Sequence, residues 1–135
     1  MTLLALDTSV LVPLLSDWHE SHSAARAAVG DEDPAVPAHV LLETFSVLTR
    51  IPAPNRISPA AAAGAVEALR LPVIGLPPQE VQSVIGAVGA RGVRGGAIYD
   101  ALVGATAAKH GLILLTRDRR AIQTYEAVGA TYRAV

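Results

Sequence analysis

Three carboxylates stand alone in segments of the sequence that otherwise favour burial. Asp7, Glu43 and Asp100 are each the only charged residue within at least fourteen consecutive positions. Buried carboxylates are rare in proteins unless they are paired or bound to a metal ion. Each one alone is equally well explained as a helix cap, a helix-dipole partner or a solvated flank, so a site is indicated only if the three meet.

A fourth acid, Asp118, follows the apolar run 112–115. Carboxylates gathered in one place repel, and two charges about 4 Å apart cost roughly 4 kcal/mol at an effective dielectric near 20. A cation would offset that cost. Oxygen ligands without a cysteine or histidine set favour Mg²⁺ or Mn²⁺ over zinc. Such ions activate water and brace a phosphate in an in-line displacement, so converging acids would indicate phosphate chemistry.

The elements that would position these acids alternate between short apolar runs and helical patterns. This alternation predicts an α/β fold with a parallel sheet of about five strands covered by helices. We expect strands over residues 3–6, 35–38, 72–76, 112–115 and 131–135. We expect helices over residues 10–15, 21–29, 39–50, 58–69, 78–90, 97–110 and 118–128, with room for a helical hairpin between Pro37 and Leu71.

Ligands of open α/β sheets bind outside the carboxyl ends of the strands, where the strand order reverses. Asp7 ends the first predicted strand and Asp118 follows the fourth. If those strands are neighbours, both acids face one crevice. Asp100 begins the helix that precedes the fourth strand, and pattern alone places it at that edge only if the helix is tilted.

Four short motifs resemble those of PIN-domain nucleases, in the same order along nearly the whole chain. They are Leu6-Asp7-Thr8-Ser9, the helix bearing Glu43, Tyr99-Asp100-Ala101-Leu102-Val103-Gly104-Ala105, and Leu115-Thr116-Arg117-Asp118. The chain length, and Leu48-Thr49-Arg50 before a proline-rich loop, resemble the VapC type. These are the ribonuclease toxins of bacterial toxin–antitoxin pairs.

The resemblance implies an α/β/α sandwich with strand order 3-2-1-4-5, which makes the first and fourth strands neighbours. It implies an acidic pocket in which Asp7 and Asp100 are the main Mg²⁺ ligands and Glu43 and Asp118 act directly or through water. The hydroxyls of Thr8, Ser9 and Thr116 would orient carboxylates or waters.

The resemblance also implies a reaction and its partners. A metal-activated water, with Mn²⁺ as a possible substitute for Mg²⁺, would cleave RNA to a 5′-phosphate and a 3′-hydroxyl. A homodimer is expected, as is inhibition by a cognate VapB-type antitoxin whose C-terminal segment crosses the pocket.

Composition limits the classes of protein open to this chain. Its 135 residues suit a single domain, 1–135, and 51% hydrophobic against 17% charged residues excludes disorder as the main state. There is no cysteine, which excludes disulfides and thiolate chemistry. Asp7 interrupts the N-terminal apolar run and no apolar stretch reaches 18 residues, so we expect a cytoplasmic protein without signal peptide or membrane span.

The net charge of −1 conceals an uneven distribution. Residues 1–90 hold four basic and nine acidic side chains, whereas residues 91–120 hold six basic side chains and two acids. That basic excess surrounds Asp100 and Asp118 and could receive an RNA backbone. Candidate RNA contacts are Arg94, Arg117 and Arg119, with Arg117 equally suited to structural pairing.

Other functions are open to the same residues. A non-catalytic PIN-like module that binds RNA or protein is possible, although retention of all four acids argues against it. A phosphotransfer domain would also place an aspartate after the first strand. Haloacid-dehalogenase-like phosphatases carry a second aspartate two residues later, where this chain has Ser9. His39 could pair with Glu43, and Tyr125 is expected to pack rather than to stack on bases.

Overall fold

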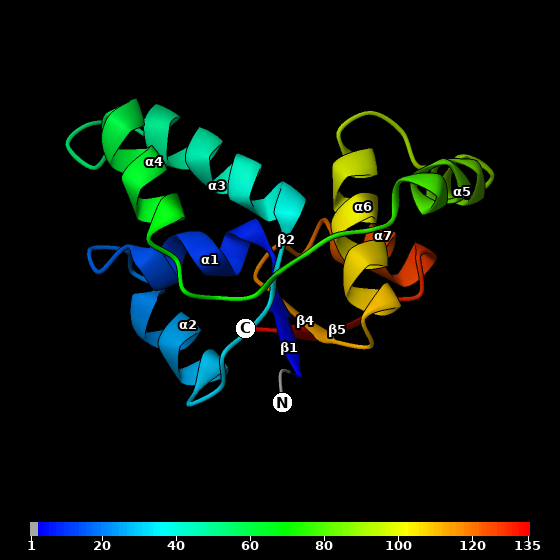
Figure 1. Cartoon of the computed structure of the whole chain (residues 1–135), viewed down its shortest axis with the longest axis horizontal. Coiled ribbons are helices and arrows are strands. Elements are labelled where there is room, and N and C mark those ends of the chain that lie inside the picture. The colour runs from blue at the N-terminus through cyan, green and yellow to red at the C-terminus, as the bar shows by residue number, and fades with distance from the viewer. Residues whose placement is uncertain (1–2) are drawn as a thin grey trace.

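The computed structural model describes residues 3–135, in which five strands alternate with seven helices (Figure 1). The strands are β1 (Leu4–Leu6), β2 (Val36–Pro37), β3 (Val73–Ile74), β4 (Ile113–Thr116) and β5 (Thr131–Ala134). The helices are α1 (Thr8–Leu15), α2 (His22–Val29), α3 (Ala38–Arg50), α4 (Pro59–Glu67), α5 (Pro78–Gly89), α6 (Ala97–Lys109) and α7 (Ile122–Ala127). The predicted α/β class and strand number are confirmed.

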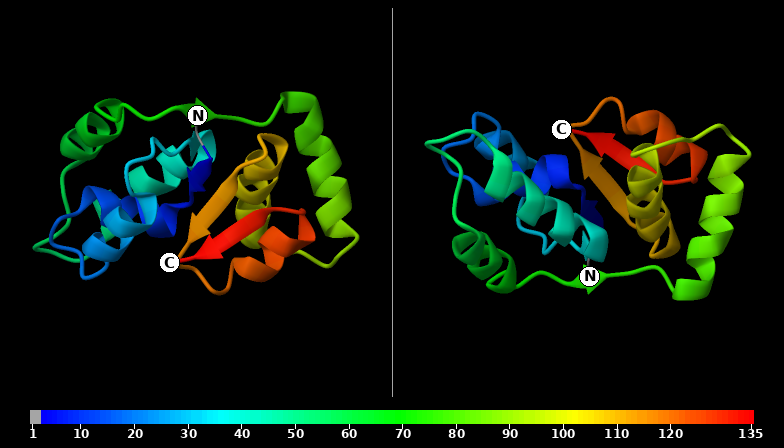
Figure 2. Two further views of the ribbon diagram at one scale, coloured as in Figure 1. Left: turned by 90° about the horizontal axis from the view of Figure 1, so that it is seen from below. Right: turned by 90° about the horizontal axis from the view of Figure 1, so that it is seen from above.

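The sheet has the strand order that the resemblance implied. Strands β1, β4 and β5 pair in parallel in that order, and β2 pairs in parallel with β3. A parallel bridge between Ala5 and Ala35 joins the two parts. The resulting order is 3-2-1-4-5. Helices α1 to α4 lie on one side of the strands and α5 to α7 on the other (Figures 1 and 2).

The register of β1 against β4 fixes where the site lies. Leu6 is opposite Leu115, and the Asp7 backbone N–H donates to the Leu115 carbonyl at 3.2 Å. Asp7 therefore follows β1 at the carboxyl edge of the sheet, beside Thr116, the last residue of β4. The strands themselves are short and fully apolar up to that point, as expected for strands covered on both faces.

Several element boundaries differ from the predicted ones. Helix α7 begins at Ile122 rather than Asp118, because the Asp118 carboxylate accepts a hydrogen bond from the Arg120 backbone N–H and holds a turn there. Helix α1 begins at Thr8, so Asp7 takes the N-cap position, yet its carboxylate makes no capping hydrogen bond. Ser58 caps α4 as its sequence predicts, with Pro59 next.

The predicted hairpin between residues 37 and 71 is present. Helices α3 and α4 pack side by side, and α3 also packs on α1 (Figure 1). Leu48 from α3 and Ala62 from α4 are buried together with Val12 from α1 in a small second core. This packing ties α3, which carries Glu43, to the helix that follows Asp7. No helix within residues 3–135 has the length and apolar character needed to cross a membrane.

Helices α6 and α7 approach each other closely at Gly104. A Cβ at this position would lie 2.8 Å from Val128 Cγ2 and 3.0 Å from Tyr125 Cδ1. Tyr125 is 1% exposed, so its ring has little room to retreat. The glycine in the third motif is therefore explained by packing: it lets α6 lie against the Tyr125 ring.

We expect Gly104→Ala to lower the free energy of unfolding by about 1–3 kcal/mol, because the added methyl overpacks a closed interface. Urea unfolding followed by circular dichroism measures this change. Gly86→Ala in α5 is the matched control, since nothing lies within 4 Å of its Cβ position. There the substitution should stabilise by about 0.4–1 kcal/mol. Equal effects of the two substitutions would contradict the close packing.

Candidate active site

Four carboxylates lie near the carboxyl edge of β1 and β4, and the charges of the other three act on Asp100. Asp7 ends β1, Glu43 lies on α3, Asp100 begins α6, and Asp118 follows β4. The negative charges of Glu43, Asp118 and Asp7 all act on Asp100 and raise its pKa. The structure thus brings together all four acids that the sequence singled out, including Asp100, which pattern alone left uncertain.

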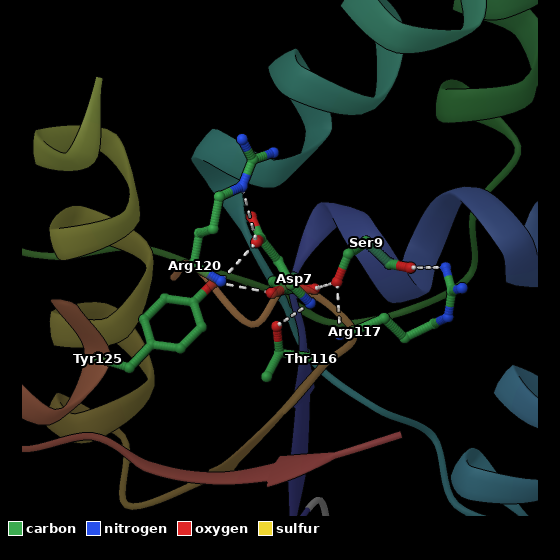
Figure 3. A network of polar contacts seen from close by, with 7 residues as sticks. Asp7, Ser9, Thr116, Arg117, Arg120 and Tyr125 are labelled. Atoms are coloured by element: carbon green, nitrogen blue, oxygen red, sulfur yellow. Dashed lines mark hydrogen bonds and ion pairs between the residues drawn. The ribbon is translucent and has the colours of Figure 1, made fainter. Parts of the chain in front are cut away.

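Asp7 is the most deeply buried of these acids, at 4% exposed. Ser9 Oγ donates to its Oδ1 at 2.5 Å, and the Tyr125 hydroxyl donates to its Oδ2 at 2.7 Å (Figure 3). Burial raises the pKa of Asp7, and hydrogen bonds from the Ser9, Thr116 and Tyr125 side chains partly oppose that rise. Protein hydroxyls therefore fix both carboxylate oxygens in place.

Ser9 also ties the first motif to the fourth. The Arg117 backbone N–H donates to Ser9 Oγ at 2.7 Å, and Arg117 Nη1 donates to the Ser9 carbonyl at 3.4 Å (Figure 3). The Arg117 side chain is thus turned toward α1. Of the two roles open to it from sequence, its contacts give it structural pairing.

Glu43 is held from α1 by one hydrogen bond. Thr8 Oγ1 donates to Glu43 Oε1 at 3.0 Å, and His39 Nε2 lies 4.0 Å from the same oxygen. The predicted pairing of His39 with Glu43 is therefore present. The His39 ring also stacks on Tyr99, with centroids 5.1 Å apart and planes 7° apart, and so joins α3 to α6 beside Asp100.

Asp100 differs from its neighbours because it has no hydrogen-bond donor among residues 3–135 to relieve its burial. Desolvation is the largest cause of its raised pKa, followed by the charges of Glu43, Asp118 and Asp7; Arg120 alone acts in the opposite direction. Together they raise the pKa of Asp100 to about 6. Among the four acids, its oxygens have the fewest hydrogen bonds to the described part of the chain.

Asp118 is held by the turn after β4. Its backbone N–H donates to Thr116 Oγ1 at 3.1 Å, and its Oδ1 accepts from the Arg120 backbone N–H at 3.0 Å. Arg120 Nε lies 3.9 Å from that same oxygen, although the Arg120 side chain is 97% exposed (Figure 3). Arg120 is thus an exposed positive group beside the acids.

Two residues of the site were not among the sequence candidates. Tyr125 was expected only to pack, and its hydroxyl is a direct partner of Asp7. The sequence places Arg120 only among the basic residues and favours Arg94 and Arg119 as RNA contacts. Arg94 lies on the loop before α6 and lines a cavity that Arg120 also lines, and Arg119 is exposed. The sequence holds no signal for Tyr125, because its position against Gly104 and Asp7 appears only in the fold.

The donors available to a cation are carboxylate oxygens. Within residues 3–135, no three acidic or histidine side chains converge closely enough to hold a metal ion unaided. Mg²⁺ usually binds proteins through one or two carboxylates and keeps several waters. An arrangement of four acids in electrostatic range, with Asp100 unengaged, suits such a hydrated ion better than a dehydrated cage.

Comparison with known proteins identifies relatives across the chain. The PIN domain family model matches residues 4–127. Ribonuclease VapC40 of Mycobacterium tuberculosis is 43% identical over 125 residues, covering 92% of each chain. Ribonuclease VapC27 of the same organism is 41% identical over 127 residues, covering 93% of this chain and 92% of the relative.

Solved structures show the same fold at lower identity. DNA-bound VapBC from Salmonella typhimurium aligns with a TM-score of 0.71 at 17% identity, covering 99% of this chain and 98% of that one. The Mycobacterium tuberculosis VapC20, a sarcin-ricin loop cleaving toxin, aligns with a TM-score of 0.70 at 21% identity, covering 95% and 96%. At these identities the likeness concerns the fold alone.

We expect Asp100→Asn to stabilise the metal-free protein at pH 7.5. The folded pKa of Asp100 is about 6 against an ordinary 3.8, so the wild type loses stability as pH rises through about 6. The amide carries no charge and escapes that loss. Thermal unfolding in EDTA should give the variant a higher Tm at pH 7.5, with the difference shrinking toward pH 4. Asp17→Asn, at an exposed position, is the control. No gain at pH 7.5 would contradict the proposed repulsion.

We expect Tyr125→Phe to destabilise the protein most at high pH. The ring packing stays, but the charged form of Asp7 loses a donor, which costs about 1.5–3 kcal/mol of unfolding free energy. The pKa of Asp7, already raised, should rise further, so the deficit should fall as pH decreases and Asp7 becomes protonated. Urea unfolding at pH 7.5 and 4.5 measures both. Tyr132→Phe, whose hydroxyl donates to exposed Glu126, should show little change.

Proposed function

The chain belongs to the PIN-domain family, in its VapC group, and from this premise we propose that it is an endoribonuclease, the toxin of a VapBC-type toxin–antitoxin pair. The observation that carries the proposal is the placement of four carboxylates at one sheet edge, where the charges of Glu43, Asp118 and Asp7 raise the pKa of Asp100. Such a cluster is costly to the fold and is accounted for by a cationic cofactor and a phosphate substrate.

We propose Mg²⁺ as the cofactor, with Mn²⁺ as a possible substitute. Asp7 and Asp100 would be the main ligands, and Glu43 and Asp118 would act directly or through water. When bound, the ion supplies Lewis-acid activation of a water and charge neutralisation at the phosphate. In line with the family resemblance, the products would be a 5′-phosphate and a 3′-hydroxyl.

The chain's own residues prepare this chemistry by orientation. Ser9 and Tyr125 fix the two oxygens of Asp7, so its carboxylate plane is set before any ligand arrives. Thr8 directs one oxygen of Glu43, and Thr116 holds the backbone of Asp118. Preorganised carboxylates need no rearrangement as charge develops on the reacting phosphate.

A cognate VapB-type antitoxin is the proposed inhibitor. Two observations support this proposal. Structural neighbours across nearly the whole chain come from VapBC complexes. The four acids also concentrate negative charge around Asp100. A basic antitoxin side chain in the pocket would neutralise the acids. We propose a homodimer as the working assembly, in line with the family resemblance.

A non-catalytic RNA- or protein-binding module is the second candidate from the sequence. The burial of Asp7 and the hydrogen bonds to both of its oxygens argue against this candidate, because binding RNA or protein requires no buried, oriented carboxylate. A purely structural acid would instead be expected to cap α1, and Asp7 makes no such hydrogen bond. The nuclease is therefore the better supported function.

Asp7→Asn and Asp100→Asn should each reduce RNA cleavage by about 10²-fold or more, since each loses a charge that the reaction needs. The measurement is cleavage of total RNA with Mg²⁺ and of the same RNA in EDTA, beside growth arrest on expression. Asp17→Asn, at an exposed position, is the matched control. Full cleavage by both site variants would remove the assignment. Cleavage that survives EDTA would remove the metal and leave the nuclease.

A further inference from the structure

A cavity of about 800 Å³ opens beside the acidic pocket, between the loop that joins α5 to α6 and helix α7. The loop arches over this side of the molecule (Figure 1). Its lining includes three arginines, Arg91, Arg94 and Arg120, together with the amide of Gln123. Cavities of this volume accept ligands of nucleotide size or larger.

The cavity carries a positive charge that the protein does not neutralise. Within residues 3–135, neither Arg91 nor Arg94 takes part in an ion pair. The only acid in the lining is Glu126, which accepts a hydrogen bond from the Tyr132 hydroxyl at 3.0 Å. Guanidinium groups without a carboxylate partner are available to phosphate, which they bind through paired N–H donors.

Arg120 connects the cavity to the acids. Its side chain lines the cavity, and its Nε lies 3.9 Å from Asp118 Oδ1. Its charge also acts on Asp100, whose pKa it lowers. A polyanion passing the acidic pocket would therefore meet Arg120 first and then the two unpaired arginines.

The loop that carries those arginines has a backbone that few other sequences could adopt. Gly92 and Gly95 have φ values of 79° and 61°, in the left-handed region that side chains disfavour. They flank the Val93-Arg94 pair, and Val93 N donates to the Val88 carbonyl at 3.1 Å. This backbone places Arg94 on the loop that lines the cavity.

Resting on the proposed function, we propose that this cavity binds the phosphate backbone of the RNA strand on one side of the cleaved bond. Arg91 and Arg94 hold a phosphate away from the acids, Arg120 spans the two sites, and the Gln123 amide faces the sugar or base edge. The occupant is RNA rather than an acidic protein segment, because Arg120 both lines the cavity and lies 3.9 Å from Asp118, beside the acids where a phosphate would react.

The test is binding of a fluorescein-labelled 12-nucleotide RNA, followed by anisotropy in EDTA at several salt concentrations. Each phosphate contact on a single strand contributes about 0.7 to the slope of log K against log salt. Arg91→Ala with Arg94→Ala should therefore reduce the slope by about 1.4 and raise Kd by roughly 10-fold or more at low salt. The control is Arg26→Ala with Arg70→Ala. It removes the same charge at two exposed positions outside the cavity lining, on α2 and before β3.

The outcomes separate this inference from the proposed function. An unchanged slope in the Arg91 and Arg94 variant, an equal loss in the control, or no RNA binding by the wild type would overturn the cavity assignment. So would loss of antitoxin binding alone, which would make the cavity a protein-docking site. Cleavage of the same RNA in Mg²⁺ is scored separately. A wild type that binds through the arginines but cuts nothing would remove the nuclease and leave the cavity.

Discussion

The buried Asp7 carboxylate is the constraint on which the rest of the site depends. It lies at the end of a strand with only 4% of its surface exposed, and burial raises its pKa. Its two oxygens are held from opposite sides, by Ser9 on α1 and by Tyr125 on α7. Tyr125 reaches it only because Gly104 lets α6 and α7 approach. The buried Asp7 carboxylate is thus stabilised by the relative positions of three helices, α1, α6 and α7.

The acids work against the stability of the fold. Desolvation and three neighbouring charges raise the pKa of Asp100, and only Arg120 opposes them. Apolar or amide side chains would fill the same space without that cost. This electrostatic cost therefore falls at the place where the sequence departs from apolar patterning, which is where a functional site is expected.

The sequence was most informative where charge interrupts an apolar run. Asp7, Glu43 and Asp100 were visible for that reason, and alternation predicted the elements within a few residues, apart from the late start of α7. Strand order came from the resemblance, since short strands alone do not specify their neighbours. Tyr125 and Arg120 were missed because their roles come from tertiary contacts: one lies in an ordinary helical run, the other among several arginines. Arg117 was ambiguous until its contacts with Ser9 were seen.

The small net charge of the chain is compatible with a polyanionic substrate because the charges are separated in space. The acidic pocket repels phosphate unless a cation intervenes, whereas the arginine cavity attracts it without one. Arg120 lies at the boundary between them. It is close to Asp118, its charge lowers the pKa of Asp100, and its side chain is exposed enough to contact a ligand. A strand of RNA would be held first by the cavity, and its reacting phosphate would enter the pocket only with the ion. Under the proposed function, separating attachment from chemistry in this way would make cleavage depend on the metal even when the RNA is already bound.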